Sequence, residues 1–135
     1  MKRNIVILSA VLFAACSKSN NNPMSSSTVS FKNNVQPIFT NNCALSGCHA
    51  GSIPQEGQNL SAGQAFNNIV NVQSIEVPSF FRVKPSYSDS SYLYMKISGD
   101  PRIAAGTVRM PKGGTLQPND IQTIKDWIDQ GAQDN

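Results

Sequence analysis

The segment that most constrains this chain holds two cysteines and its only histidine. Cys43 and Cys48 are separated by four residues, and His49 follows the second cysteine directly. Gly47 and the small residues before it allow the intervening backbone to loop out. Two thiols and one imidazole suit a disulfide, a zinc centre, a thiol redox pair or the attachment point of a covalently bound haem. Any fold of this chain must therefore hold these three side chains at one place.

Haem attachment accounts best for this spacing. The usual haem c motif is Cys-x-x-Cys-His, in which two thiols bond to vinyl groups on one porphyrin edge and the histidine ligates the iron. A Cys43–Cys48 disulfide stays open because exported proteins form such bonds. Zinc would lack a fourth ligand, since the next carboxylate is Glu56, and a redox pair would prefer a two-residue gap. We therefore predict one haem c, attached through Cys43 and Cys48 and ligated by His49.

A second iron ligand must come from a residue other than histidine, and methionine is the natural candidate. Two of the four methionines precede the expected folded region. Met95 falls among apolar residues of an expected helix, where a core position is the simpler interpretation. Met110 lies in a glycine-rich loop before Pro111, about sixty residues after His49. We predict Met110 as the second axial ligand, with a loop-anchoring apolar contact as the alternative.

The N-terminus has the pattern of an export signal. A positive start precedes the apolar run 5–15, which is too short to span a bilayer. The run ends in Leu12-Phe13-Ala14-Ala15-Cys16, which resembles the lipobox of bacterial lipoproteins, although Phe13 stands where that family usually has leucine. We expect residues 1–15 to be a signal peptide and Cys16 to be lipidated, which anchors the chain stably to a membrane. An ordinary secretory signal and a membrane-anchoring helix are the alternatives.

Lipidation also explains the cysteine count and the charge. Acylation of Cys16 leaves Cys43 and Cys48 as the one remaining pair. Loss of residues 1–15 leaves nine of the eleven Lys and Arg residues against eight Asp and Glu, so no basic cluster remains to favour nucleic acid. Ser17 follows Cys16 where an aspartate would favour inner-membrane retention. We expect a lipid-anchored protein of the bacterial periplasm or outer membrane, with a mild preference for the outer membrane.

The mature chain divides into a tether and one domain. Residues 16–28 are polar and lack periodicity, which predicts a flexible tether. Residues 29–135 form a domain with a thin core that a large buried cofactor would complete. Two loops, 71–87 and 102–117, are long enough to wrap around a flat ligand.

We predict an all-α domain, because short segments have helical periodicity and no stretch alternates as a strand. The first expected helix is capped by Ser30 and carries Phe31, Val35, Ile38 and Phe39, and the second is capped by Ser61 and carries Ala62, Ala65, Phe66, Ile69 and Val70. The third is capped by Ser88, Asp89 or Ser90 and ends at Gly99. The fourth begins at Pro118, has Ile121, Ile124 and Ile128 on one face, and ends at Gly131. Candidate haem-packing residues are Leu60, Phe66, Val83, Leu93, Leu116 and Trp127, and for each of them ordinary core packing is an equal alternative. Candidate partners of the haem propionates are Arg82, Lys84 and Arg109, with solvated surface charge as the alternative.

A family resemblance extends over nearly all of residues 31–132. It lies in Val35-Gln36-Pro37-Ile38-Phe39, Gly47-Cys48-His49-Ala50-Gly51, Ser91-Tyr92-Leu93-Tyr94-Met95-Lys96-Ile97-Ser98-Gly99, Arg109-Met110-Pro111 and Ile124-Lys125-Asp126-Trp127-Ile128-Asp129-Gln130-Gly131-Ala132. The chain resembles the small monohaem cytochrome c domains of bacterial lipoproteins, related to the planctomycete type. The resemblance implies a cytochrome c-like fold, with N- and C-terminal helices crossing near the haem. The four-residue gap between the cysteines departs from the usual motif and bears on attachment through Cys43.

These features together predict a membrane-tethered electron carrier. Its partners would be redox proteins and the membrane, with no nucleic acid. We expect no catalytic activity of its own, since no nucleophile and base or paired carboxylates are evident. Two alternatives stay open, a five-coordinate ligand-binding or peroxidase-like haem protein and a haem-free surface module held by a disulfide.

Overall fold

A computed structural model of the chain describes residues 27–103 and 105–135. The expected signal peptide, Cys16 and most of the expected tether lie outside the described residues. None of the helices in the described ranges combines the length and the apolar character that crossing a membrane requires.

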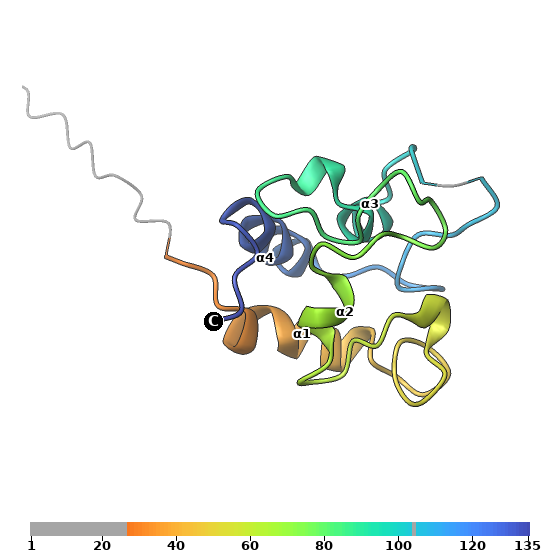
Figure 1. Cartoon of the computed structure of the whole chain (residues 1–135), viewed down its shortest axis with the longest axis horizontal. Coiled ribbons are helices and arrows are strands. Elements are labelled where there is room, and N and C mark those ends of the chain that lie inside the picture. Colours follow the sequence, from red (N-terminus) through yellow and green to blue (C-terminus); the bar gives the residue numbers. More distant parts are fainter. Residues whose placement is uncertain (1–26, 104) are drawn as a thin grey trace, which may run out of the picture.

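The described part of the chain is all-α, as predicted (Figure 1). Extended pairing within it is limited to single bridges between Val70 and Val83, Gln73 and Phe81, and Phe81 and Ser91. The helices are α1 (Gln36–Asn42), α2 (Ala65–Ile69), α3 (Tyr92–Ser98) and α4 (Pro118–Asp129), and the single turns are η1 (Phe31–Val35), η2 (Gln55–Gly57) and η3 (Ser88–Ser90).

The first helical segment begins at its predicted cap. The Ser30 hydroxyl accepts a hydrogen bond from the Asn33 amide at 3.1 Å. The wide turn η1 follows and leads directly into α1. Pro37 lies in the first turn of α1, where its missing N–H costs no intrahelical bond. Ser30 is thus confirmed as a cap, and Pro37 marks the start of the regular helix.

The prediction that Ser61 caps the second helix was wrong. Helix α2 begins only at Ala65, after Gln64, and has no side-chain cap. Gly63 has a φ of +76°, which lies outside the helical region and prevents a regular helix from starting at Ala62. The Ser61 carbonyl still accepts hydrogen bonds from the Gln64 and Ala65 amides, so a turn replaces the expected first turn of helix.

The predicted caps of the third helix were also wrong. Ser88 to Ser90 form the separate turn η3, and Ser91 occupies the cap position of α3. The buried Ser91 hydroxyl does not cap α3, because it bonds to the Lys84 amide at 2.9 Å and the Tyr87 carbonyl at 2.9 Å. The predicted end is confirmed, since Gly99 terminates α3 in the left-handed conformation.

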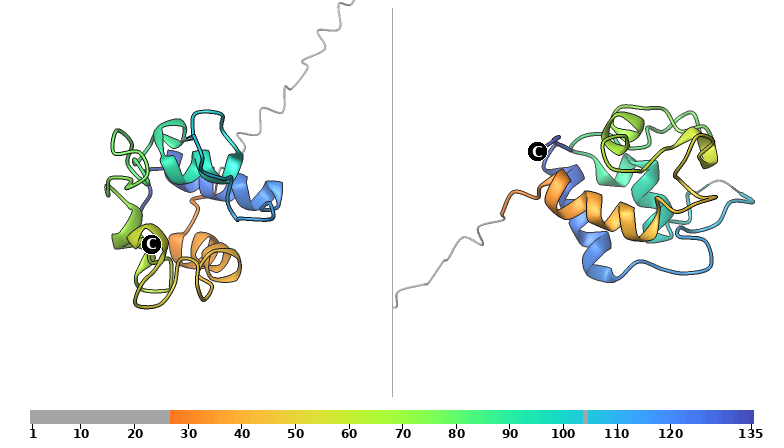
Figure 2. Two further views of the ribbon diagram at one scale, coloured as in Figure 1. Left: turned by 90° about the vertical axis from the view of Figure 1, so that its right-hand side faces the viewer. Right: turned by 90° about the horizontal axis from the view of Figure 1, so that it is seen from below.

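Helix α4 agrees with its prediction at both ends. Pro118 is its first residue, and Gly131 follows its end with a φ of +102°. Ile124, Trp127 and Ile128 are buried, and α4 packs against η1 and α3 (Figures 1 and 2). The ring centroids of Trp127 and Phe31 lie 5.0 Å apart. The N-terminal and C-terminal helical segments are therefore joined by an aromatic contact in the core.

Both ends of the described domain meet at one corner. The Asn135 carbonyl accepts hydrogen bonds from the Ser30 hydroxyl at 2.8 Å and the Lys32 amide at 2.9 Å. The Val29 amide donates to the Gln130 side chain at 2.8 Å. The loops around 43–57 and 105–112 lie at the opposite end of the molecule in Figure 1 and in the right view of Figure 2.

Candidate functional site

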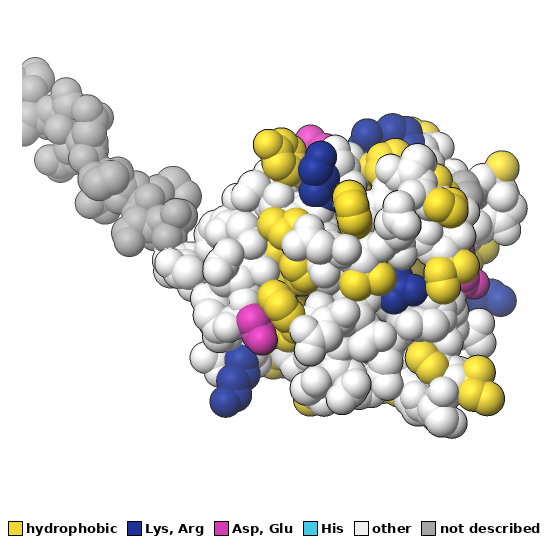
Figure 3. All heavy atoms as spheres, viewed as in Figure 1, with side chains coloured by type: hydrophobic (Ala, Val, Ile, Leu, Met, Phe, Trp, Pro, Cys, Tyr) yellow, Lys and Arg dark blue, Asp and Glu magenta, His cyan; other side chains and the backbone are white. Residues whose placement is uncertain are grey.

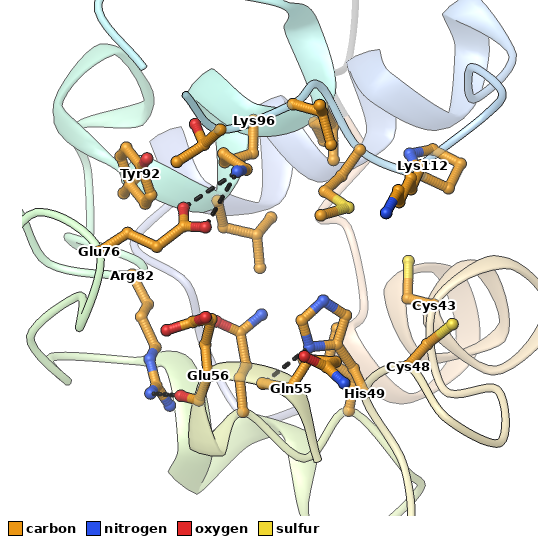
Figure 4. A pocket seen from close by; sticks show the side chains of 18 of the residues that line it. Cys43, Cys48, His49, Gln55, Glu56, Glu76, Arg82, Tyr92, Lys96 and Lys112 are labelled. Atoms are coloured by element: carbon orange, nitrogen blue, oxygen red, sulfur yellow. Dashed lines mark hydrogen bonds and ion pairs between the residues drawn. The ribbon is translucent and has the colours of Figure 1, made fainter. Parts of the chain in front are cut away.

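A cavity of about 580 Å³ lies between these loops and α3 (Figure 4). Its lining comes from the loop after α1, the segment 74–82, helix α3 and the loop 106–112. Cys43, Cys48, His49 and Met110 all line this one cavity. The structure therefore brings together the four predicted site residues that it describes, although about sixty residues separate His49 from Met110 in the chain.

His49 sits in a loop closed by its own backbone. Its carbonyl accepts a hydrogen bond from the Leu60 amide at 2.7 Å, and its amide donates to the Cys43 carbonyl at 3.1 Å. The ring Nδ1 lies 3.2 Å from the Gln55 carbonyl oxygen, and Figure 4 shows the ring pointing into the cavity. A carbonyl only accepts, so Nδ1 carries the proton in the neutral ring and Nε2 presents its lone pair.

The surroundings of His49 keep the ring neutral. Burial lowers the pKa of His49 below its ordinary value, and the Arg82 charge acts in the same direction, against the hydrogen bonds to backbone at Gln55 and Gln58. A neutral imidazole whose other nitrogen is held by a backbone carbonyl is the usual state of a metal-ligating histidine.

The two cysteines lie beside His49 on one side of the cavity (Figure 4). Both are free thiols in the structure. Cys43 follows the last turn of α1 and is half-buried, whereas Cys48 is exposed. Burial, and secondly the nearby Cys48, raise the pKa of the Cys43 thiol to about 11. Because both thiols line the cavity beside His49, the two cysteines could attach one edge of a ligand that the His49 ring also contacts.

Met110 reaches the cavity from a loop fixed to α3. Its amide donates a hydrogen bond to the Lys96 carbonyl at 2.9 Å, and its side chain is half-buried. Met95, the alternative methionine, is fully buried within α3 and does not line the cavity. Only Met110 of these two can therefore meet a ligand there.

Part of the cavity wall is hydrophobic core. Leu60 and Leu93 line it as predicted, together with Phe39 and Ile97, and all four are buried. The other predicted packing residues belong to the same core but do not line the cavity. Trp127, for example, packs on Phe31 and donates its indole N–H to the Gln133 carbonyl at 2.9 Å. The residues outside the lining are Phe66, Val83, Leu116 and Trp127.

The predicted propionate partners are placed differently from the prediction. Arg82 lines the cavity, but its guanidinium donates to three backbone carbonyls. Lys84 lies over the Tyr87 ring, 4.6 Å from its centroid, and is not part of the lining. Arg109 is also outside the lining, and its Nε donates to the Ile97 carbonyl at 2.9 Å.

Sequence reasoning missed two lysines of the cavity, Lys96 and Lys112. Lys96 is 7% exposed, and its ammonium pairs with Glu76 at 2.9 Å inside the cavity wall (Figure 4). A signal was available, because Lys96 stands between two buried positions of α3, Met95 and Ile97. The sequence alone did not indicate that a cavity adjoins this face of the helix.

Within the described ranges, no three His, Cys, Asp or Glu side chains are grouped so that they could hold a metal ion. Comparison of the chain with protein-family models, curated proteins and solved structures found no match. What the cavity could bind must therefore be inferred from the side chains that line it.

These side chains fit a covalently bound haem. The cavity volume falls within the range of roughly 300–1,000 Å³ typical of ligand and cofactor sites. The donors are two thiols on one side, an imidazole with an available Nε2 and a thioether from a separate loop, which is a haem c donor set. Buried apolar side chains supply the wall that a flat apolar ring needs.

Proposed function

We propose that this chain is a membrane-tethered monohaem c-type cytochrome with a cytochrome c-like fold, and that it transfers electrons. Cys43 and Cys48 would attach haem c, and His49 and Met110 would ligate its iron. The observation that carries the proposal is that these four side chains, from two distant segments, line the same cavity.

Each residue has a defined task in this proposal. Cys43 and Cys48 would hold the edge of the haem, and the Gln55 carbonyl, which contacts the His49 Nδ1, orients the ring so that Nε2 could bind the iron. Met110 supplies a soft thioether ligand, which raises the reduction potential. When bound, the haem supplies a one-electron ferric/ferrous couple. The chain contributes orientation and exclusion of water through Phe39, Leu60, Leu93 and Ile97.

The cavity wall carries charges of both signs, with Arg82, Lys96 and Lys112 alongside Glu56 and Glu76. Because the Lys96 ammonium is already paired with Glu76, we assign Lys112, in place of Lys84 and Arg109, as a partner for a carboxylate of the haem. Glu76 holds the Lys96 ammonium in the cavity wall.

The cavity rim suits contact with redox partner proteins. Leu45, Ile75 and Val108 are exposed and line the cavity. On the face in Figure 3, hydrophobic side chains lie in small separate groups within mostly uncharged surface. Such a rim fits brief contacts that release the partner after electron transfer. Lipidation at Cys16 would keep these contacts at the membrane, with the outer membrane preferred, and no catalytic step of the chain's own is needed.

Intact mass of the mature protein tests the proposal. The chain is produced in a bacterial host with cytochrome maturation machinery, and its mass is compared with that of a Cys43→Ala, Cys48→Ala double variant. We expect one haem-sized addition in the wild type and none in the double variant. A wild-type mass without this addition would overturn the proposal and favour the haem-free surface module.

A second candidate, the five-coordinate haem protein, is favoured only if Met110 does not ligate the iron. A high-spin ferric spectrum that changes at once on adding cyanide, or a ferrous spectrum that changes at once with carbon monoxide, would establish it. A low-spin spectrum resistant to both supports the electron carrier.

A further inference from the structure

We propose that Arg82 is the positioning residue for His49, holding the loop whose Gln55 carbonyl fixes the imidazole. This inference deepens the proposed function, because a role of Arg82 in iron ligation requires that haem is bound. The hydrogen bonds of Arg82 themselves lie within the chain and do not depend on haem.

The Arg82 guanidinium is engaged entirely with backbone of other segments. Its Nη2 donates to the Glu56 carbonyl at 2.6 Å, and its Nη1 donates to the Asn68 carbonyl at 2.7 Å and the Gly57 carbonyl at 3.4 Å. Arg82 is only 6% exposed. A buried guanidinium with several carbonyl partners in a fixed fork holds them in one arrangement, which an ammonium cannot reproduce.

Two of the three bonded carbonyls directly follow the one that contacts His49. Gln55 accepts from the His49 ring and Glu56 accepts from Arg82 (Figure 4). Gly57 also accepts from Arg82. Both Glu56 and Gly57 have positive φ, 55° and 58°. This conformation is uncommon for a residue other than glycine. The bond to Arg82 stabilises Glu56 in it and so fixes the adjacent peptide that meets the ring.

Arg82 also connects this loop to the side of the cavity that carries Met110. The Arg82 carbonyl accepts a hydrogen bond from the Leu93 amide of α3 at 2.9 Å. The Met110 amide donates to the Lys96 carbonyl of the same helix at 2.9 Å. Helix α3 is therefore hydrogen-bonded both to the backbone of Arg82 and to the backbone of Met110. The Arg82 side chain extends this connection to the loop that contacts His49.

The test measures the His49 ring proton in the full-length protein. His49 is the only histidine, so ¹⁵N labelling of histidine rings gives one unambiguous pair of nitrogen signals. The variant Arg82→Lys keeps the charge but cannot hold the three carbonyls. The matched control is Arg109→Lys, because Arg109 also donates to a backbone carbonyl near the cavity but does not touch the His49 loop.

We expect a slowly exchanging Nδ1 proton in the wild type, read in the ferrous state when haem is bound. Exchange in Arg82→Lys should be faster by about tenfold or more, since a hydrogen bond from a charged donor is lost. Arg109→Lys should match the wild type. Wild-type exchange in a folded Arg82→Lys protein, verified by far-ultraviolet circular dichroism, would overturn the inference.

Two further measurements keep the outcomes separable. If Arg82→Lys does not fold, scalar couplings across hydrogen bonds from the Arg82 Nη groups to the Glu56 and Asn68 carbonyl carbons are measured in the wild type. Their presence supports the inference, and their absence overturns it. In a chain without haem, the Nδ1-protonated tautomer is read from the same ¹⁵N signals, so failure of the proposed function and failure of the Arg82 role are distinguishable.

Discussion

Met95 and Met110 are chemically identical but differ in what each faces. Met95 is 0% exposed within α3, whereas Met110 lines the cavity. We predict that Met110→Ala abolishes the near-infrared Met-to-ferric-iron band and lowers the reduction potential, because a thioether ligand stabilises the ferrous state. The measurements are an absorption spectrum of the ferric protein and a redox titration.

The control for this substitution is Met95→Leu, which conserves volume in the core and leaves the iron ligand in place. The band should survive in it. If instead Met95→Leu loses the band while Met110→Ala keeps it, Met110 is not the axial ligand.

The two cysteines should react unequally when no haem is attached. Only the thiolate is nucleophilic, and the pKa of Cys43 near 11 leaves this half-buried residue almost wholly protonated at pH 8. Iodoacetamide should therefore modify the exposed Cys48 first, and modification of Cys43 should accelerate as the pH rises toward 11. Peptide mass spectrometry of a haem-free Cys16→Ser variant checks this order. Equal rates at pH 8 would contradict the burial of Cys43.

At the scale of elements, helix α4 supplies a fully buried face to the core. Ile128 is 0% exposed and belongs to the core with Trp127 and Phe31. We predict that Ile128→Ala lowers the free energy of unfolding by about 2–5 kcal/mol through lost burial and a residual cavity. Ile53→Ala is the control, because Ile53 is 90% exposed and should change stability by no more than about 0.5 kcal/mol. Urea unfolding of both variants measures the difference.

How well each element was predicted depended on where its signals lay. Helix α4 was predictable because Pro118, the apolar spacing and Gly131 all lie within its own sequence. The starts of α2 and α3 were not, because Gly63 takes a left-handed conformation and the Ser91 hydroxyl bonds to the distant Lys84 amide. Caps are local only when no tertiary partner competes for the side chain.

The candidate site shows the same division. Cys43, Cys48 and His49 were found from one short motif, and Met110 from residue chemistry and its loop context. Lys96 and the three-carbonyl role of Arg82 depend on which segments meet across the cavity, and no spacing in the sequence encodes that meeting. For Trp127 the alternative of ordinary core packing applies, and apolar character alone does not say which face of a core a ring joins.

At the scale of the whole molecule, the proposed lipid anchor at Cys16 would decide where the protein acts. We predict that Cys16→Ser moves the protein from the membrane fraction to the soluble fraction of cells, since no acyl chain can then be attached. The haem-sized mass addition should persist, because Cys43, Cys48, His49 and Met110 are unchanged in this variant. Fractionation and intact mass on the same sample check both expectations. Retention in the membrane after high-salt washing would contradict a lipid anchor at this residue.

The hydrogen bonds that join Asn135 to Ser30 and Lys32 have a practical consequence. Because both ends leave from one corner, opposite the cavity, the domain can be spliced into a surface loop of a carrier protein. It can equally be grafted by either end to an electrode, with the cavity facing the solution. A peptide fused after Asn135 would emerge beside Ser30, at the end away from the cavity, and would leave the cavity mouth unobstructed.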